Sequence, residues 1–188
     1  MSRSARSWSS ARRYFLPNLK AYEAKLALFD ADAKAARTWL DEYFVTEVER
    51  IELVRVFQHF TTVRAYLALG RVEEAERLLD DLLEFARAFN RPLDRGEAGA
   101  LKSALLWATG RKAEAVDVLT SALEELAPYG FYRVVADEGA AVEPVLKSLA
   151  GRMARPDYAG SLDRAFVQEA LLAAHDRAGR FRGVTANL

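Results

Sequence analysis

The chain has 188 residues, of which 27 are basic, 27 are acidic, two are histidine and none is cysteine. Without cysteine it can form neither a disulfide nor a thiolate metal site, and the expected compartment is the cytoplasm. No apolar run approaches the ~20 residues that cross a bilayer, and the start lacks the apolar segment of a secretory signal, so no membrane association is expected.

The first 15 residues are rich in serine and arginine and contain no acidic residue. Their four arginines leave 23 basic side chains against 27 acidic ones in the rest of the chain, a net charge of −4. Phosphate contacts need clustered Lys and Arg, so we expect no direct, specific DNA binding by this chain. Residues 1–15 are interpreted as a flexible leader, with an organelle transit peptide or an arm that contacts nucleic acid as alternatives.

A repeat of about forty residues organises the rest of the chain. Residues 70–75 read Gly-Arg-x-x-Glu-Ala, and residues 110–115 read the same; a fainter copy lies in residues 31–36. Such a period is typical of a helical solenoid, in which each helix hairpin needs a neighbour to cover its apolar face. Glycine would end one helix, and the alanine would let two antiparallel helices approach closely. The repeat predicts these structural positions: Ala36, Gly70, Ala75, Gly110 and Ala115.

Apolar periodicity and turn residues predict the helices. In chain order they are residues 17–29 (with Pro17 in the first turn), 32–43, 52–69, 72–89, 94–109, 112–126, a short helix or extended turn at 131–136, 143–153, and a last helix capped by Ser161 that ends near Asp176. Gly96 and Gly99 are expected to weaken the start of the helix at 94–109. The prediction is an all-α chain with three antiparallel hairpins, a shorter pair and a terminal capping helix, so residues 16–178 form the solenoid. Residues 179–188 are expected to fray.

The helix predicted at residues 52–69 combines an apolar face with a polar one. First helices of such hairpins line the concave side of a superhelix, where solenoids bind ligands. Arg64 falls inside the apolar face, which predicts a partly buried guanidinium with an acidic partner on a neighbouring helix. The candidate ligand-binding residues are the polar stripe Arg55, His59, Thr62 and Tyr66, together with Lys102, which is level with Thr62 in the next repeat, and Arg133. An ordinary solvated helix face is the alternative.

Other polar or aromatic residues have a structural interpretation as the stronger one. Trp39 and Trp107 occupy repeat positions held by leucine and are expected in the core, with ligand stacking as the alternative. Asp137 and Glu138 are interpreted as a structural corner whose carboxylates accept from the backbone or from Arg133. The two histidines have no predicted second ligand, and no nucleophile or acid–base pair is apparent, so we expect no metal, no cofactor and no enzymatic activity.

Residues 59–71 also fit the pattern His-x-Thr-x-x-Arg-x-x-Leu-Ala-x-Gly-Arg, and residues 128–139 carry Pro-x-Gly, Arg and Asp-Glu-Gly in order. With these two motifs, residues 16–174 resemble the tetratricopeptide-like (TPR-like) region of the large LuxR-family transcriptional regulators, the MalT-like group. The resemblance implies a right-handed superhelix of TPR-like antiparallel helix hairpins that acts as a sensor. Neither a phosphate-binding loop nor a helix-turn-helix is found, so the chain looks like the sensor region alone, excised or free-standing.

The resemblance implies a non-catalytic sensor or regulatory module that binds a small inducer or a regulatory protein in its concave groove. The side chains of the polar stripe suit a polar or anionic metabolite or an acidic peptide, and a neutral sugar stacked on Tyr66 is a further candidate. The alternative function is a free-standing TPR adaptor that binds a peptide or protein partner without a role in transcription. Self-association also stays open.

Overall fold

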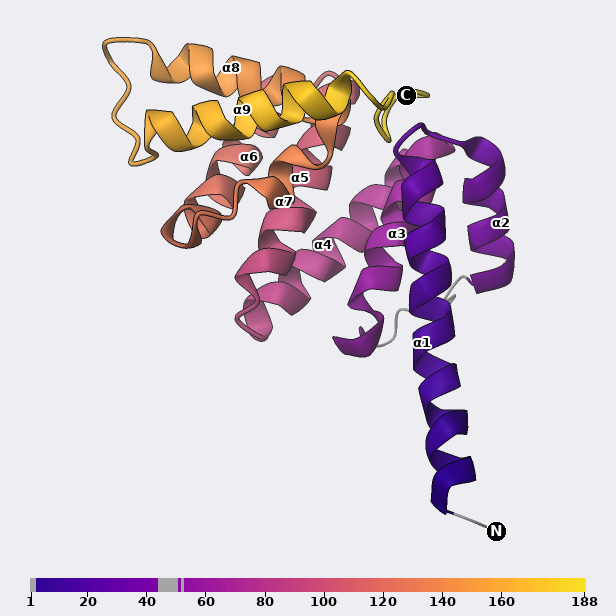
Figure 1. Cartoon of the computed structure of the whole chain (residues 1–188). Helices are drawn as coiled ribbons and strands as arrows, with labels where there is room; N and C mark the ends of the chain where they lie inside the picture. Colours follow the sequence, from indigo (N-terminus) through magenta and orange to yellow (C-terminus); the bar gives the residue numbers. More distant parts are fainter. Residues whose placement is uncertain (1–2, 44–50, 52) are drawn as a thin grey trace.

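Figure 1 shows the computed structural model, which describes residues 3–43, 51 and 53–188. The α-helices are α1 (Arg3–Leu28), α2 (Ala33–Tyr43), α3 (Val56–Ala68), α4 (Val72–Ala88), α5 (Pro92–Ala108), α6 (Lys112–Leu126), α7 (Arg133–Ala136), α8 (Glu143–Met153) and α9 (Arg164–Ala178). Three short 3-10 helices are η1 (Leu53–Arg55), η2 (Ala127–Tyr129) and η3 (Gly139–Ala141). No strand occurs among the described residues, and the all-helical prediction is confirmed.

The helices form successive antiparallel hairpins, α1 with α2, α3 with α4 and α5 with α6, followed by α7 and the pair α8 and α9 (Figure 1). Each hairpin packs on the next one, as expected of a solenoid. The predicted helix at residues 52–69 is η1 followed by α3, and its expected first residue, Glu52, lies outside the described residues. None of the helices in the described part of the chain is long and apolar enough to cross a membrane.

The hairpin corners have the backbone that the repeat predicts. Gly70 and Gly110 have φ values of +71° and +86°, the left-handed conformation that glycine adopts without steric cost. Ala31, which stands at the same place in the faint first copy, has φ +53°. For a residue with a Cβ this conformation costs about 1–2 kcal/mol. The first corner therefore has the same backbone as the other two although Ala31 is strained there. All three copies of the repeat therefore end their first helix in the same way.

Small residues allow close approach where the helices of a hairpin meet. Ala36, Ala75 and Ala115 are all completely buried, as predicted. Gly96 and Gly99, expected only to weaken the start of α5, are packing positions. A Cβ on Gly99 would lie 2.7 Å from the Cβ of Ala122 on α6, and one on Gly96 would lie 2.6 Å from a methyl carbon of Leu126. The two glycines let α5 and α6 pack more closely than any residue with a side chain would allow.

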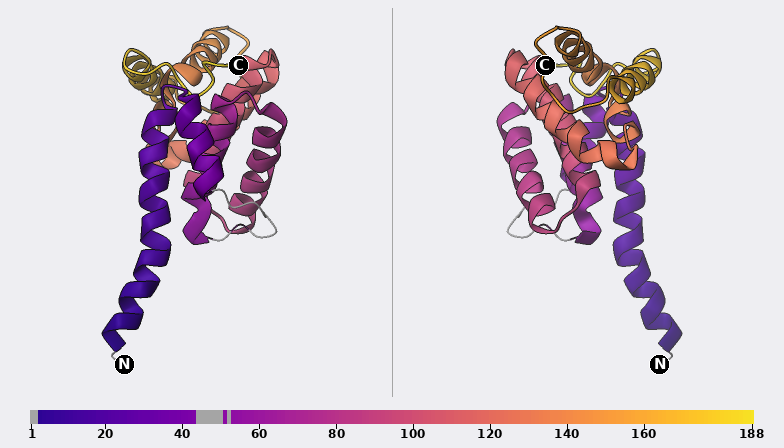
Figure 2. Two further views of the ribbon diagram at one scale, coloured as in Figure 1. Left: turned by 90° about the vertical axis from the view of Figure 1, so that its right-hand side faces the viewer. Right: turned by 90° about the vertical axis from the view of Figure 1, so that its left-hand side faces the viewer.

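Two helix starts differ from the prediction. Pro17 lies inside α1, which begins at Arg3 and so includes most of the residues assigned to the leader. Figure 2 shows that this N-terminal part of α1 extends beyond the other helices. The last helix is capped by Asp163, whose carboxylate accepts from the amide of Ala165 at 2.8 Å, and Ser161 instead donates to Glu124 at 3.0 Å. Serine and aspartate cap helices about equally well, so composition alone could not choose between them.

The segment after α9 is packed instead of frayed. It turns back to the corner between α1 and α2, where the amide of Gly183 donates to the carbonyl of Phe29 at 2.7 Å. Val184 is completely buried in the main core. The end of the described chain therefore contacts its first hairpin.

Candidate functional site

The predicted polar stripe on α3 is enclosed by neighbouring helices. His59, Thr62 and Tyr66 are 2%, 3% and 6% exposed, because α1 and α2 both pack on α3. The indole Nε1 of Trp39 donates to Thr62 Oγ1 at 3.0 Å, and that hydroxyl donates to the carbonyl of Gln58 at 3.0 Å. Thr62 therefore satisfies a buried indole, and these side chains do not form the solvent-facing wall that the helix pattern predicted.

The other predicted site residues lie elsewhere and are not brought together with the stripe. Arg55 is half-buried at the end of η1. Lys102 on α5 forms an ion pair with Asp80 on α4. Arg133 is 65% exposed on α7 and pairs with Asp137 at 3.2 Å, which is the corner contact that the sequence suggested. The six residues do not share one surface.

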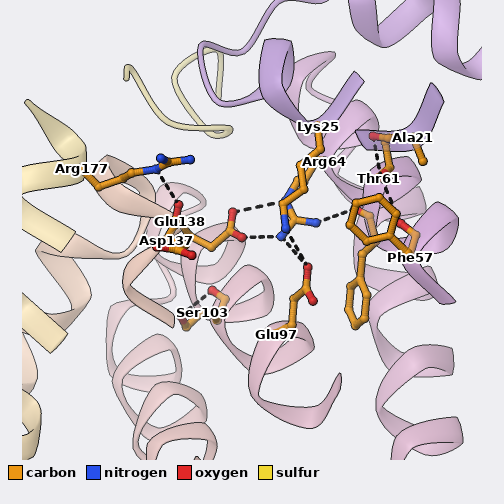
Figure 3. A network of polar contacts seen from close by, with 12 residues as sticks. Ala21, Lys25, Phe57, Thr61, Arg64, Glu97, Ser103, Asp137, Glu138 and Arg177 are labelled. Atoms are coloured by element: carbon orange, nitrogen blue, oxygen red, sulfur yellow. Dashed lines mark hydrogen bonds and ion pairs between the residues drawn. The ribbon is translucent and has the colours of Figure 1, made fainter. Parts of the chain in front are cut away.

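Beside the stripe, four charged side chains form what we call the Arg64 cluster: Arg64, Glu138, Glu97 and Lys25 (Figure 3). The Arg64 guanidinium is completely buried; it pairs with Glu138 through Nη2 and lies 2.7 Å from Glu97 Oε1. Its Nη1 donates to the carbonyl of Phe60 at 3.3 Å, and Lys25 Nζ lies 3.4 Å from Glu97 Oε1. The predicted buried guanidinium with an acidic partner is confirmed.

Two cations and two carboxylates make the Arg64 cluster formally neutral. Burial lowers the pKa of Arg64, but Glu138 and Glu97 raise it more, so its pKa is raised and the guanidinium stays charged. Burial also raises the pKa of Glu97, while Arg64 and Lys25 lower it more, and the net pKa lies below the ordinary value. The cluster joins α1, α3, α5 and the corner after α7, so it holds three hairpins and the C-terminal helices in one register.

Stability is expected to fall in acid through Glu97. Its lowered pKa in the folded state means that the carboxylate stabilises the fold above pH 4.5, the ordinary value, and that this contribution is lost as the pH falls from 4.5 through the lowered pKa. Urea unfolding at a series of pH values should therefore show a shallower decline below pH 4.5 in Glu97→Gln than in the wild type. Equal slopes in the two proteins would contradict the assignment.

An open groove lies on another face, between α4, α5 and α6. Its volume is about 320 Å³. Arg95 on α5 reaches Glu125 on α6 at 2.6 Å, and Lys102 lies on the α4 side with Asp80. Its lining residues are Leu83, Arg87, Arg95, Gly99, Lys102, Asp117, Val118, Ser121, Ala122 and Glu125. We call this the α4–α6 groove, and Lys102 is the one predicted site residue that it contains.

The α4–α6 groove offers both hydrogen-bond donors and acceptors. Guanidinium and ammonium groups donate, carboxylates accept, and the Ser121 hydroxyl does both. Sequence analysis missed this groove because its residues come from three helices in two repeats. The early glycine at position 99, which lines the groove, was the available signal, since a missing side chain in a helix allows a neighbouring helix to pack closely.

The two tryptophans behave mainly as structural residues. Trp39 is 2% exposed, as expected of a core residue. Trp107 is half-buried, with the Lys112 ammonium 5.2 Å from its ring centroid. Within the described residues, no group of three or more His, Asp or Glu side chains is arranged to hold a metal ion.

Comparison with known proteins agrees with this architecture. Residues 3–152 match the family model of the MalT-like TPR region. Two curated relatives, each called HTH-type transcriptional regulator MalT and found in two strains of Klebsiella pneumoniae, are 32% identical to the chain over 118 residues. That alignment covers 63% of this chain and 13% of each relative, so the chain spans a small part of their length. No solved structure matches.

The family match covers most of the helices described above, from the start of α1 almost to the end of α8. It includes the three glycine or alanine corners and all four residues of the Arg64 cluster. The chain belongs to the MalT-like TPR region family.

Proposed function

We propose that the chain is the non-catalytic sensor or regulatory module of a LuxR-type, MalT-like transcriptional regulator that acts in the cytoplasm. The observation that carries the proposal is the family match over residues 3–152, supported by relatives that are named as HTH-type transcriptional regulators. In such a module a binding event changes the packing of helices, and the change is passed to the rest of the regulator.

The ligand of this proposal is a small polar inducer held in the α4–α6 groove. The groove is open, whereas the predicted stripe on α3 is filled by the chain's own side chains. Because Arg87, Arg95, Lys102, Asp117 and Glu125 all line it, a compound with several hydroxyl or carboxylate groups can meet donors and acceptors at once. Polar groups placed in this way fix the orientation of a small ligand and make binding specific for compounds whose own polar groups match them.

A thermal-shift screen of polar metabolites tests the proposal. A ligand that binds only the folded state stabilises it by about 2.7 kcal/mol at a concentration of 100 times Kd. The double variant Arg87→Glu, Ser121→Ala changes two exposed groove residues, so it should fold normally and lose this stabilisation. Arg77→Glu, an exposed change on the same helix outside the groove lining, should keep it. A hit that stabilises the double variant as much as the wild type would place the ligand elsewhere.

The adaptor alternative is favoured by one surface feature. Four large apolar side chains line a cleft of about 400 Å³ near the α4–α5 corner and are 44–66% exposed: Phe89, Leu93, Tyr129 and Phe131. Exposed apolar patches of this kind mark protein interfaces. If the adaptor function is right, Tyr129→Ser with Phe131→Ser should abolish binding of the partner protein, while changes in the α4–α6 groove leave that binding intact. The opposite result would support the inducer site.

A further inference from the structure

The segment of residues 181–187, here called the closing segment, binds the first hairpin through backbone and side-chain donors (Figure 1). The Gly183 amide donates to the Phe29 carbonyl at 2.7 Å, and the Arg182 amide donates to Asp30 Oδ1 at 3.1 Å. Asn187 Nδ2 donates to two carbonyls, those of Ala31 at 3.0 Å and Ala68 at 2.8 Å. One carboxamide thus joins the ends of α1 and α3.

These carbonyls can accept hydrogen bonds from the closing segment because they lie at or just after the C-terminal ends of helices. Phe29 and Ala31 follow the last turn of α1, and Ala68 is the last residue of α3. The final carbonyls of a helix have no partner within it and stand at the negative end of its dipole. The ends of α1 and α3 lie close enough together to form a small acceptor site, which a short segment of chain with suitably spaced donors can fill.

Shape adds selectivity to this acceptor site. Gly183 has φ +86°, and a Cβ there would lie 3.0 Å from the amide nitrogen of Ala141, so a side chain is excluded at that point. The next residue, Val184, is completely buried. Phe181 lies 5.6 Å from the Phe29 ring, and the Arg177 guanidinium lies 4.2 Å and 4.4 Å from the centroids of these two rings. The site therefore accepts an aromatic residue, a glycine two positions after it and a small apolar residue directly after the glycine. A carboxamide follows three positions after the apolar residue.

The closing segment is held less firmly than the helices around it. Only Gly183 and Val184 are buried, and residues 185–188 are partly or fully exposed. The segment has no helix of its own beyond isolated turns. Segments with few buried apolar groups and no regular backbone hydrogen bonds open at low free-energy cost. Release of this segment does not require any hairpin to unfold.

We propose that the corner formed by the ends of α1 and α3 is a binding site for a short peptide in a turn conformation, which the chain's own closing segment occupies, and that a partner protein binds there by displacing it. The partner presents a linear segment of the same chemistry, with glycine before a small apolar residue and asparagine three residues after that. This site is separate from the α4–α6 groove, so the proposal stands whether or not that groove binds an inducer.

A labelled peptide with the sequence of residues 181–188, Phe-Arg-Gly-Val-Thr-Ala-Asn-Leu, tests the proposal on the full chain. In the wild type the closing segment competes with the peptide. In Asn187→Ala the segment loses both bonds of its carboxamide, so fluorescence anisotropy should show at least about tenfold tighter peptide binding, since the fraction of open sites sets the apparent Kd. Peptides in which the residue equivalent to Val184 is aspartate should not bind. Thr185→Ala, a change at a partly exposed position of the same segment, should behave as wild type.

Hydrogen exchange gives a second readout that does not depend on a variant. The Gly183 amide of the wild type should exchange at least about tenfold faster than the helix amides of the core, because its bond to Phe29 opens without global unfolding. If this amide exchanges as slowly as the core amides, or if the peptide binds Asn187→Ala no better than the wild type, the closing segment is a fixed part of the fold and the proposal fails.

Discussion

Replacement of Arg64 by methionine is expected to lower the free energy of unfolding by about 3–5 kcal/mol, the usual cost of removing one partner of a buried ion pair. The guanidinium is completely buried, and Glu138, its partner, is 2% exposed. Without Arg64 the Glu138 carboxylate stays in the core without its cation, whereas Glu97 keeps Lys25. Urea denaturation followed by circular dichroism measures the loss.

Two further variants separate the buried charge from loss of packing. Arg64→Met with Glu138→Met removes both charges and should recover part of the stability, since replacing a whole buried pair by apolar residues is often neutral or favourable. Arg155→Met breaks an ion pair whose side chains are 66% and 68% exposed, and it should cost less than about 1 kcal/mol. If Arg64→Met lowers the free energy of unfolding no more than Arg155→Met does, the Arg64 cluster does not stabilise the fold.

Alanine at position 99 is expected to destabilise the protein by up to roughly 2 kcal/mol. Alanine gains about 1 kcal/mol over glycine inside a helix. Against this, the new Cβ would lie 2.7 Å from the Cβ of Ala122, and such overpacking costs about 1–3 kcal/mol. The Ala122 Cβ is fixed to the backbone of α6 and cannot rotate away, so the helices must move apart and the steric cost dominates. Thermal and urea unfolding measure the difference.

The same substitution at Gly151 provides the matched control. Gly151 lies in α8, is exposed, and has no atom within 4 Å of the place where a Cβ would stand. Gly151→Ala should therefore stabilise the protein by about 0.5–1 kcal/mol. Opposite signs at the two positions are the expected result. A stabilising Gly99→Ala would show that α5 and α6 are less closely packed than the structure has them.

Local periodic signals predicted most of this fold. The glycine corners and the buried alanines recur every 39 or 40 residues, and each is decided by contacts within one hairpin. Arg64 was also predictable, because a charged residue inside an apolar helix face must find a partner of opposite charge. Glu138 as that partner was not, since 74 residues separate the two and no pattern relates them.

The burial of the polar stripe could not be predicted from the sequence of α3 alone. A helical wheel treats His59, Thr62 and Tyr66 as a solvent-exposed face, yet all three side chains are buried. Thr62 finds the indole of Trp39, which a wheel of α3 alone does not contain. The closing segment was missed for a related reason. It has no period, and its contacts lie on a hairpin at the other end of the described chain.

The bonds of the closing segment also bear on the order in which the molecule folds. Each hairpin can form from its own forty or so residues, so most contacts of a solenoid are local and form early. The bonds from Arg182 to Asp30 and from Asn187 to Ala31 join residues 152 and 156 positions apart. The entropy of closing so long a loop is offset only once the intervening hairpins have stacked and brought its ends together. Solenoids usually lack such a step, and here it makes the two ends of the described chain the last parts to meet.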